Sequence, residues 1–391
     1  MPLLEKFSVA GQLKSGLGNV GKDPTSVVFD KLNSATEGVV EGRTTILAGT
    51  NNYLGLTFDP ACIAAGVAAM QSQGTGTTGS RMANGSYAAH GALEAELADL
   101  YQCSNAMVFS TGYAANLGVL TALLGKGDAV LLDSDAHASL YDGCGMSQAD
   151  IYRFKHNDVQ SLERRIKRLG DRSGRCLIVV EGMYSVLGDC APLKEIVEIK
   201  ERYGARLLVD EAHSLGVFGE HGCGVAEAEG VLDKVDFVVG TFSKSLGAMG
   251  GFCVSRHDVL GLFRYVSRPF MFTASPSPAV MATTREALKQ LRSRPELKET
   301  LWSNARQLYN GLKDLGFELG PEISPVVAVR CKDRESALAQ WNQLLEAGIY
   351  VNMMLPPATP RGASFLRCSI SAAHTPEQIS AIIEKFAELN N

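Results

Sequence analysis

The sequence lacks the signatures of several common protein classes. Its nine cysteines stand singly, with no CxxC or CxxH pair, which argues against a zinc site or a disulfide framework and favours reduced core thiols. The densest basic run, residues 164–168, is typical of a solvated helix face, and the net charge is −5, so nucleic acid is not an expected partner. A GxxxxGK(S/T) loop is also missing, which excludes a P-loop ATP motor.

Long apolar runs of the kind that cross membranes are missing too. Residues 100–125 carry no charge, but glutamine, serine, threonine and asparagine side chains interrupt them, so they are expected inside a globular fold. Residues 1–16 contain no apolar stretch long enough for a signal peptide. We therefore expect a cytoplasmic protein without a transmembrane segment.

What the chain does contain is enough apolar sequence for a large core. It has 391 residues, 46% of them hydrophobic and 20% charged, which is typical of a globular protein of two or three domains. Buried strands are expected at 106–110, 129–133, 176–182, 206–212, 236–240 and 251–255, and helices at 60–73, 87–101, 158–169 and 192–203. This alternation predicts an α/β domain with a mainly parallel sheet covered on both faces.

The pattern changes after about residue 275. Two long helical patterns, 277–293 and 296–315, are followed by short strands and helices. We therefore expect an N-terminal segment (1–45), a large domain (46–275) and a smaller C-terminal α+β domain (276–391).

Two motifs resemble known binding sites but lack the neighbouring elements that those sites require. Residues 74–79 match GxGxxG, but they follow a helical pattern instead of a strand, so a flexible loop is favoured over a dinucleotide site. Residues 210–213 spell DEAH, the helicase box, but that motor also needs the missing phosphate loop. The spacing of Asp210, Glu211, His213 and His221 fits no standard metal site, so no metal is expected.

Lys244 is the first candidate catalytic residue. It is the single charged residue between Phe237 and Ser255, within the segment GTFSKSLG. Apolar surroundings lower the pKa of a lysine and make its amine nucleophilic, which suits imine formation with a carbonyl compound. Thr241 and Ser243 could hold a phosphate nearby, while the alternative is an ordinary solvated loop lysine.

Further candidates follow the ends of the expected strands. Asp210 ends the strand RLLVD, where a buried acid needs a cationic partner such as a protonated pyridine nitrogen, unless it is a helix cap or structural ion pair. Around Gly112 a strand turns into a helix whose free N–H groups attract phosphate. His137 could stack on an aromatic ring, and Arg367 could clamp a carboxylate or form a surface ion pair. Together these groups describe a pyridoxal-phosphate enzyme acting on amino acids.

At these residues the chain resembles the α-oxoamine synthase family of fold-type I pyridoxal-phosphate enzymes over essentially its whole length. The matching segments are GTNNYLGL (49–56), STGYAANLG (110–118), DAHASLYDG (135–143), EGMYSVLGD (181–189), VDEAHSLGVFG (209–219) and GTFSKSLGAMGG (240–251). The resemblance implies a mostly parallel seven-stranded sheet in the large domain.

The resemblance also implies roles for individual residues. Lys244 holds the cofactor, Asp210 pairs with its pyridinium, His137 stacks on the ring and His213 bonds the phenolic oxygen. The phosphate region is served by Gly112, Tyr113, Thr241 and Ser243, with Thr273 and Ala274 reaching in from the neighbouring subunit of a homodimer. Asn52, His137 and Arg367 meet the substrate.

Three segments, at 268–275, 351–360 and 366–370, resemble the branch that condenses L-serine with a long-chain acyl-CoA such as palmitoyl-CoA. The implied products are 3-ketosphinganine, CoA and CO₂, the first step of sphingolipid synthesis, with peripheral membrane contact for product release. Residues 372–379 also resemble glycine-using relatives such as 2-amino-3-ketobutyrate CoA ligase, and 8-amino-7-oxononanoate synthase is a further alternative.

Overall fold

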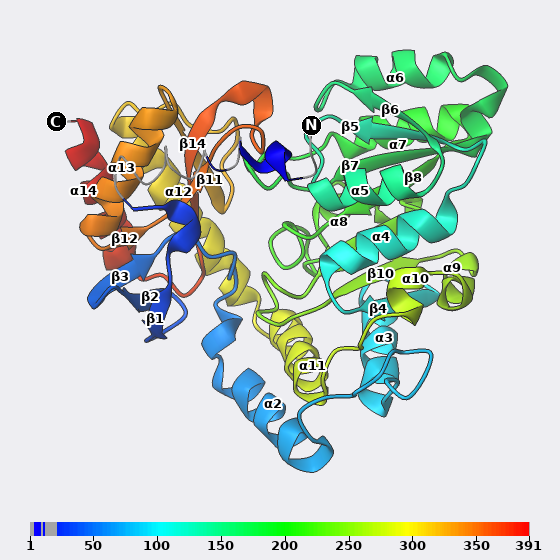
Figure 1. The fold of residues 1–391 in the computed structure, drawn as a ribbon, viewed down its shortest axis with the longest axis horizontal. Helices are drawn as coiled ribbons and strands as arrows, with labels where there is room; N and C mark the ends of the chain where they lie inside the picture. The colour runs from blue at the N-terminus through cyan, green and yellow to red at the C-terminus, as the bar shows by residue number, and fades with distance from the viewer. Residues whose placement is uncertain (1–3, 9–10, 12–21, 391) are drawn as a thin grey trace. The chain divides into compact units, whose positions relative to one another are not determined.

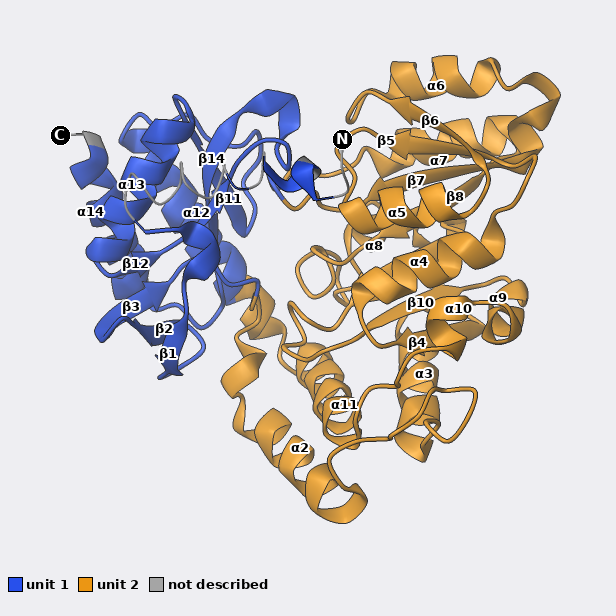
Figure 2. Cartoon of the chain, viewed as in Figure 1, with its two compact units in different colours: residues 1–51, 186–188, 300–391 blue, residues 52–185, 189–299 orange. Residues whose placement is uncertain are grey.

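The computed structural model describes residues 4–8, 11 and 22–390 (Figure 1). The chain divides into two compact units: unit 1 comprises residues 1–51, 186–188 and 300–391, and unit 2 comprises residues 52–185 and 189–299 (Figure 2). This division differs from the boundary expected at residue 275, since residues 276–299 group with unit 2 and the N-terminal residues group with the C-terminal ones. Most of residues 1–16, where no signal peptide is expected, lie outside the described residues.

Unit 2 is built on a seven-stranded sheet with the order β4-β10-β9-β8-β7-β5-β6. The four pairings from β9 through β8, β7 and β5 to β6 are parallel, and β10 runs antiparallel to both of its neighbours. This agrees with the expected mainly parallel sheet. The strands are β4 (Asn105–Phe109), β5 (Ala129–Asp133), β6 (Asp150–Phe154), β7 (Cys176–Glu181), β8 (Arg206–Asp210), β9 (Phe237–Thr241) and β10 (Gly251–Ser255).

Helices cover this sheet, which is why its central strands are continuous apolar runs. Every residue of β5, β7 and β9 is buried. Helices α4 and α5 pack against each other (Figure 1). The helices are α2 (Pro60–Gln73), α3 (Ala88–Leu100), α4 (Gly112–Leu123), α5 (Ala138–Met146), α6 (Val159–Lys167), α7 (Leu193–Tyr203), α8 (Val225–Ala228), α9 (Val259–Leu262), α10 (Arg268–Met271) and α11 (Pro278–Ser293).

The grouping of α11 with unit 2 has a packing cause. Helix α11 packs against α2, so closely that a Cβ atom on Gly66 would come 2.7 Å from Thr283 Oγ1. Helix α2 starts where expected because Asp59 accepts hydrogen bonds from the N–H groups of Ala61 and Cys62, with Pro60 at the first turn. Helix α12 (Pro295–Asp314) crosses the division between residues 299 and 300.

The described part of unit 1 contains two small sheets and the α-helices α13 and α14. One sheet has the order β1-β2-β3-β12 and the other β11-β14-β13. Trp341 is buried in the core, and its Nε1–H donates to Val351 O at 2.8 Å. The elements are β1 (Phe29–Leu32), β2 (Glu37–Val40), β3 (Arg43–Leu47), β11 (Val326–Cys331), α13 (Arg334–Glu346), β12 (Ile349–Tyr350), β13 (Asn352–Met354), β14 (Ser364–Ser369) and α14 (Pro376–Ala387).

The uncharged stretch 100–125 contains the end of α3, strand β4 and helix α4, and so is part of the globular fold. Within the described residues, no helix combines the length and apolarity needed to cross a bilayer.

Candidate active site

A cavity of about 300 Å³ lies at the carboxyl ends of the parallel strands of unit 2. Eight of the residues predicted from the sequence line it, and they stand at or after the ends of β4, β5, β8 and β9. This agrees with the rule that open parallel sheets bind ligands beyond the carboxyl ends of their strands. The lining residues are Thr111, Gly112, Tyr113, Asn116, His137, Ser139, Glu181, Asp210, Ala212, His213, Val239, Gly240, Thr241, Ser243 and Lys244.

Helix α4 begins at the cavity, directly after β4. Thr111 caps it by accepting the N–H of Ala114 at 3.0 Å. Gly112 is required here because a Cβ atom would come 2.9 Å from the Cβ atom of Thr241. The helix start therefore sits against the end of β9, and its unpaired N–H groups form a suitable place for an anion.

Asp210 ends β8 and is 5% exposed. Its Oδ1 accepts the N–H of Ala212 at 2.9 Å, and its Oδ2 accepts Nδ2 of Asn116 at 2.7 Å. Both donors are neutral, so they orient the carboxylate without cancelling its charge. A carboxylate held in this way at a cavity wall can pair with a cationic ligand atom.

His137 is exposed at the cavity and is fixed from two sides. Its backbone N–H donates to Glu181 Oε1 at 2.6 Å, and its Nδ1 accepts the N–H of Ser139 at 3.2 Å. Loss of solvent lowers the pKa of His137 below 6.5, an effect that Asp210 opposes and Lys244 reinforces. A neutral imidazole ring facing the cavity is suited to stacking on an aromatic ligand.

Glu181 is a second buried carboxyl group at the cavity, 2% exposed. Burial and then the charge of Asp210 raise the pKa of Glu181 well above 4.5. Both causes favour the neutral form of the Glu181 carboxyl group over the ionised form.

His213 follows β8 in the chain, lines the cavity and is 6% exposed. Its Nδ1 shares a hydrogen bond of 2.8 Å with Tyr53 Oη. This bond orients the imidazole ring of His213 at the cavity.

Lys244 is half-buried in the turn between β9 and β10. Thr241 Oγ1 donates to Gly250 O at 2.8 Å and lies 2.9 Å from Ser243 Oγ, so two hydroxyl groups precede the lysine at the cavity. Ser245 Oγ donates to Leu215 O at 2.5 Å and anchors the other side. Hydrogen bonds on both sides of Lys244 thus fix the turn that carries it, and Lys244 lines the cavity.

The other four predicted residues differ in their surroundings. Thr273 and Ala274, in the segment after α10, and buried Asn52 belong to unit 2 but are absent from the cavity lining formed by the described residues. Arg367 lies in unit 1, 3% exposed, and donates to Asn51 Oδ1 at 3.1 Å and Ser369 Oγ at 2.7 Å. Its burial argues against the surface ion pair, and the substrate roles of Asn52 and Arg367 stay predictions.

Four residues that support the site were not singled out from the sequence: Asn116, Ser139, Glu181 and Tyr53. Each lies inside one of the family-like segments, which was the available signal. Their partners are distant along the chain, for example 94 residues between Asn116 and Asp210, and 160 between Tyr53 and His213.

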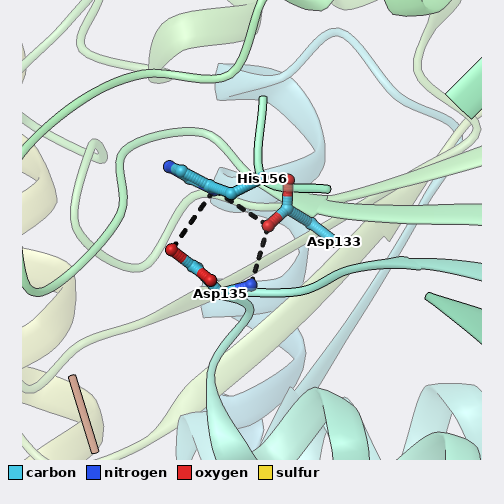
Figure 3. Close-up of side chains that lie close together, drawn as sticks. All are labelled: Asp133, Asp135 and His156. Carbon is cyan, nitrogen blue, oxygen red and sulfur yellow. Dashed lines mark hydrogen bonds and ion pairs between the residues drawn. The ribbon is translucent and has the colours of Figure 1, made fainter. Parts of the chain in front are cut away.

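One group among the described residues has the composition of a metal site: Asp133, Asp135 and His156 (Figure 3). His156 Nδ1 lies 2.9 Å from Asp133 Oδ1, and its Nε2 lies 2.7 Å from Asp189 Oδ2. Burial alone would lower the pKa of His156, but hydrogen bonds and charges from Asp133 and Asp189 outweigh it and raise the pKa to about 10. In this structure both ring nitrogens of His156 are within hydrogen-bond distance of carboxylates, which is the arrangement of an ion-paired cluster.

Comparison with known proteins places this geometry in context. Residues 43–386 match the family model "Aminotransferase class I and II". The chain is 56% identical over 389 residues to the serine palmitoyltransferase of Caulobacter vibrioides, covering 100% of this chain and 96% of that one. It is 39% identical to the 8-amino-7-oxononanoate synthase of Pelobacter propionicus, covering 90% of each.

A solved structure of SPT with a PLP internal aldimine superposes with a TM-score of 0.96 at 49% identity, covering 100% of this chain and 98% of that one. Likeness of this extent over the full length confirms the fold-type I architecture that the motifs predict. The chain belongs to the aminotransferase class I and II family.

Proposed function

We propose that the protein is a pyridoxal-phosphate-dependent acyltransferase that condenses L-serine with a long-chain acyl-CoA, palmitoyl-CoA. The products are 3-ketosphinganine, CoA and CO₂, and the reaction is the first step of sphingolipid biosynthesis. The observation that carries the proposal is the convergence of Lys244, Asp210, His137 and His213 on one cavity. The serine palmitoyltransferases among the relatives support the choice of substrates.

The residues at the cavity fit the cofactor. Asp210, oriented by Asn116, would pair with a protonated pyridine nitrogen. The start of α4 at Gly112 and Tyr113, with the hydroxyls of Thr241 and Ser243, would hold the phosphate, in a cradle that a side chain at 112 would fill. The His137 ring would stack on the pyridine ring, and His213, fixed by Tyr53, would bond the phenolic oxygen.

Lys244 has two roles in this proposal. Its amine would hold the cofactor covalently, and as a free amine it would act as the base that removes the proton from the serine α-carbon. When bound, pyridoxal phosphate withdraws electrons from that carbon and stabilises the carbanion. Attack on the acyl thioester then expels CoA, the resulting β-keto acid loses CO₂, and the product takes up a proton.

Selection of the amino acid is assigned to Arg367 and Asn52. Arg367 would clamp the serine carboxylate through its planar guanidinium group, and the buried Oδ1 of Asn52, which has no hydrogen-bond partner among the described residues, is available for a ligand. His137 would contact the substrate as well as the ring.

The proposal also covers the oligomeric state and the cellular location of the protein. Thr273 and Ala274 would complete the phosphate site of a neighbouring subunit, which requires a homodimer. The protein would work in the cytoplasm, with peripheral membrane contact for release of its lipid product.

Side-by-side turnover of serine and glycine with palmitoyl-CoA and acetyl-CoA tests the reaction. The expected result is 3-ketosphinganine from serine and palmitoyl-CoA, together with CO₂ and free CoA. Preferred turnover of glycine with a short acyl-CoA would instead support the alternative, a relative such as 2-amino-3-ketobutyrate CoA ligase. The 8-amino-7-oxononanoate synthase relative has lower identity than the serine palmitoyltransferase, 39% against 56%, which favours serine.

A further inference from the structure

His156 lies between two buried carboxylates beside the cavity, without lining it. Asp133 is fully buried and Asp189 is 6% exposed. Each accepts one ring nitrogen of His156, at 2.9 and 2.7 Å (Figure 3 shows the Asp133 side). Since each ring nitrogen faces a carboxylate oxygen, a protonated imidazole can donate to both and join its two neighbours in one ion-paired unit.

The aromatic ring of Tyr184 closes a further side of His156. The two ring centroids are 4.4 Å apart and the planes meet at 89°. Asp135 Oδ2 approaches Nδ1 to 4.0 Å from the same loop as Asp133. Two hydrogen-bonded carboxylates, a third carboxylate at 4.0 Å and the Tyr184 ring thus surround the imidazole and restrict its orientation.

Asp133 connects this unit to His137. It is the last residue of β5 and begins the five-residue loop that ends at His137. Its Oδ1 also accepts the N–H of Asp135 at 2.8 Å, and its Oδ2 accepts the N–H of Asn157 at 3.1 Å. Asp133 therefore fixes the loop main chain, and His156 fixes Asp133.

Asp189 connects His156 to the segment that contains Glu181, the residue that accepts the N–H of His137. The N–H of Tyr184 donates to Asp189 O at 2.8 Å, and Met183 pairs with Cys190, so Asp189 is tied to the end of β7. Glu181, the last residue of β7, accepts the N–H of His137 at 2.6 Å. Hydrogen bonds and two short stretches of main chain, residues 133–137 and 181–184, thus link His137, His156 and Glu181 in a closed loop.

We propose that His156 is a positioning residue that holds the His137 loop, and with it the His137 ring, in the orientation required by cofactor and amino acid. The inference rests on the proposed function in taking His137 as the residue that stacks on the cofactor ring. His156 itself touches no substrate. It acts by joining the loops that follow β5 and β7.

The test compares His156→Gln with His221→Gln in the cofactor-loaded protein. His221 is the matched control because it also pairs with a carboxylate, Glu227 at 2.6 Å, but is exposed and outside the cavity lining. In His156→Gln, kcat/KM for serine should fall about tenfold to a hundredfold, while the KM for palmitoyl-CoA changes less than about twofold. The circular dichroism of the bound cofactor near roughly 420 nm should also weaken, since it reports the asymmetry around the ring. His221→Gln should match wild type in kcat/KM for serine, in KM for palmitoyl-CoA and in the dichroism of the cofactor.

A second variant keeps the inference testable if His156→Gln folds poorly. Asp189→Asn removes one anchor and should produce the same changes in smaller degree. The double variant should be no worse than His156→Gln alone, because both changes break the same closed loop. Additive losses, or unchanged serine kinetics and cofactor dichroism in folded His156→Gln, would overturn the proposal. The dichroism comparison needs no acyl-CoA, so it remains decisive even if wild-type protein makes no 3-ketosphinganine.

Discussion

Two buried aspartates stand at opposite ends of neighbouring strands in the same sheet. Asp210 ends β8 and is 5% exposed, while Asp236 precedes β9 and is 4% exposed. Asp236 pairs with two cationic side chains of its own chain, Lys200 and Arg206, each at 3.1 Å, and its Oδ1 lies 2.7 Å from His257 Nε2. Asp210 accepts its hydrogen bonds from a neutral amide and a backbone N–H.

This difference separates a structural acid from a candidate functional one. Burial opposes ionisation of Asp236, but His257, the Leu207 N–H and Lys200 outweigh it and lower the pKa of Asp236 below 3.8. Its charge is therefore compensated within the fold. Asp210 is equally buried but oriented by neutral donors at a cavity wall, which is the arrangement that a cationic ligand atom would complete.

Lys244, which follows β9, and Lys200, the α7 residue that pairs with Asp236, give the largest expected contrast. Lys244→Ala should lower turnover at least about a hundredfold, because it removes the proposed base. Lys200→Ala should destabilise the fold and leave turnover per folded molecule near wild type. Borohydride reduction followed by peptide mapping checks the assignment: the cofactor adduct should lie on Lys244, and an adduct on another lysine contradicts it.

The substitution Asp236→Asn should lower the free energy of unfolding and leave the activity per folded molecule near wild type. Removing one partner of a buried ion pair costs about 3–5 kcal/mol, because the remaining charges lose their compensation. For a domain of this size the Tm should fall by roughly 6–20 °C in thermal unfolding. The control is Asp233→Asn, whose pair with Lys234 is exposed and should matter little. A Tm near wild type in Asp236→Asn would mean that the cluster is not structural.

Asp210→Asn should show the reverse behaviour, with the fold kept and the chemistry slowed. An amide cannot hold the pyridine nitrogen protonated, so removal of the serine α-proton should lose about 1.5–3 kcal/mol, roughly ten- to 150-fold. The measurement is exchange of the serine α-proton into deuterated buffer, with Asp236→Asn as control. Near wild-type exchange in a cofactor-loaded Asp210→Asn variant would make Asp210 structural as well.

The smallest expected effect is a dependence of stability on pH, and it concerns the side chain of His156. The pKa of His156 rises from 6.5 to about 10 on folding, so its stabilisation is complete below pH 6.5. It declines above that pH and is lost as the pH passes about 10. The Tm difference between wild type and His156→Gln should therefore be largest in mildly acid buffer and narrow steadily towards alkaline buffer. A constant difference across this range contradicts the ion-paired state of His156.

Local sequence predicted the elements with strong signals. The helix expected at 60–73 forms over those residues because Asp59 and Pro60 define its start, and the apolar run 129–133 forms β5. Strand β6 (Asp150–Phe154) escapes prediction because it is an edge strand with one buried residue, so no continuous apolar run marks it. The α2–α11 packing that places residues 276–299 in unit 2 also has no local signature.

The sequence by itself determined which residues carry the candidate chemistry. Lys244, Asp210 and His137 each stand in or directly after a strand whose apolar pattern is visible locally. Only the tertiary structure decided which side chains support them: Asn116 beside Asp210, Glu181 beside His137 and Tyr53 beside His213. The physical reason is that periodicity reports how one segment is buried, whereas these partners depend on the strand order of the whole sheet, which is set by burial of all its strands together.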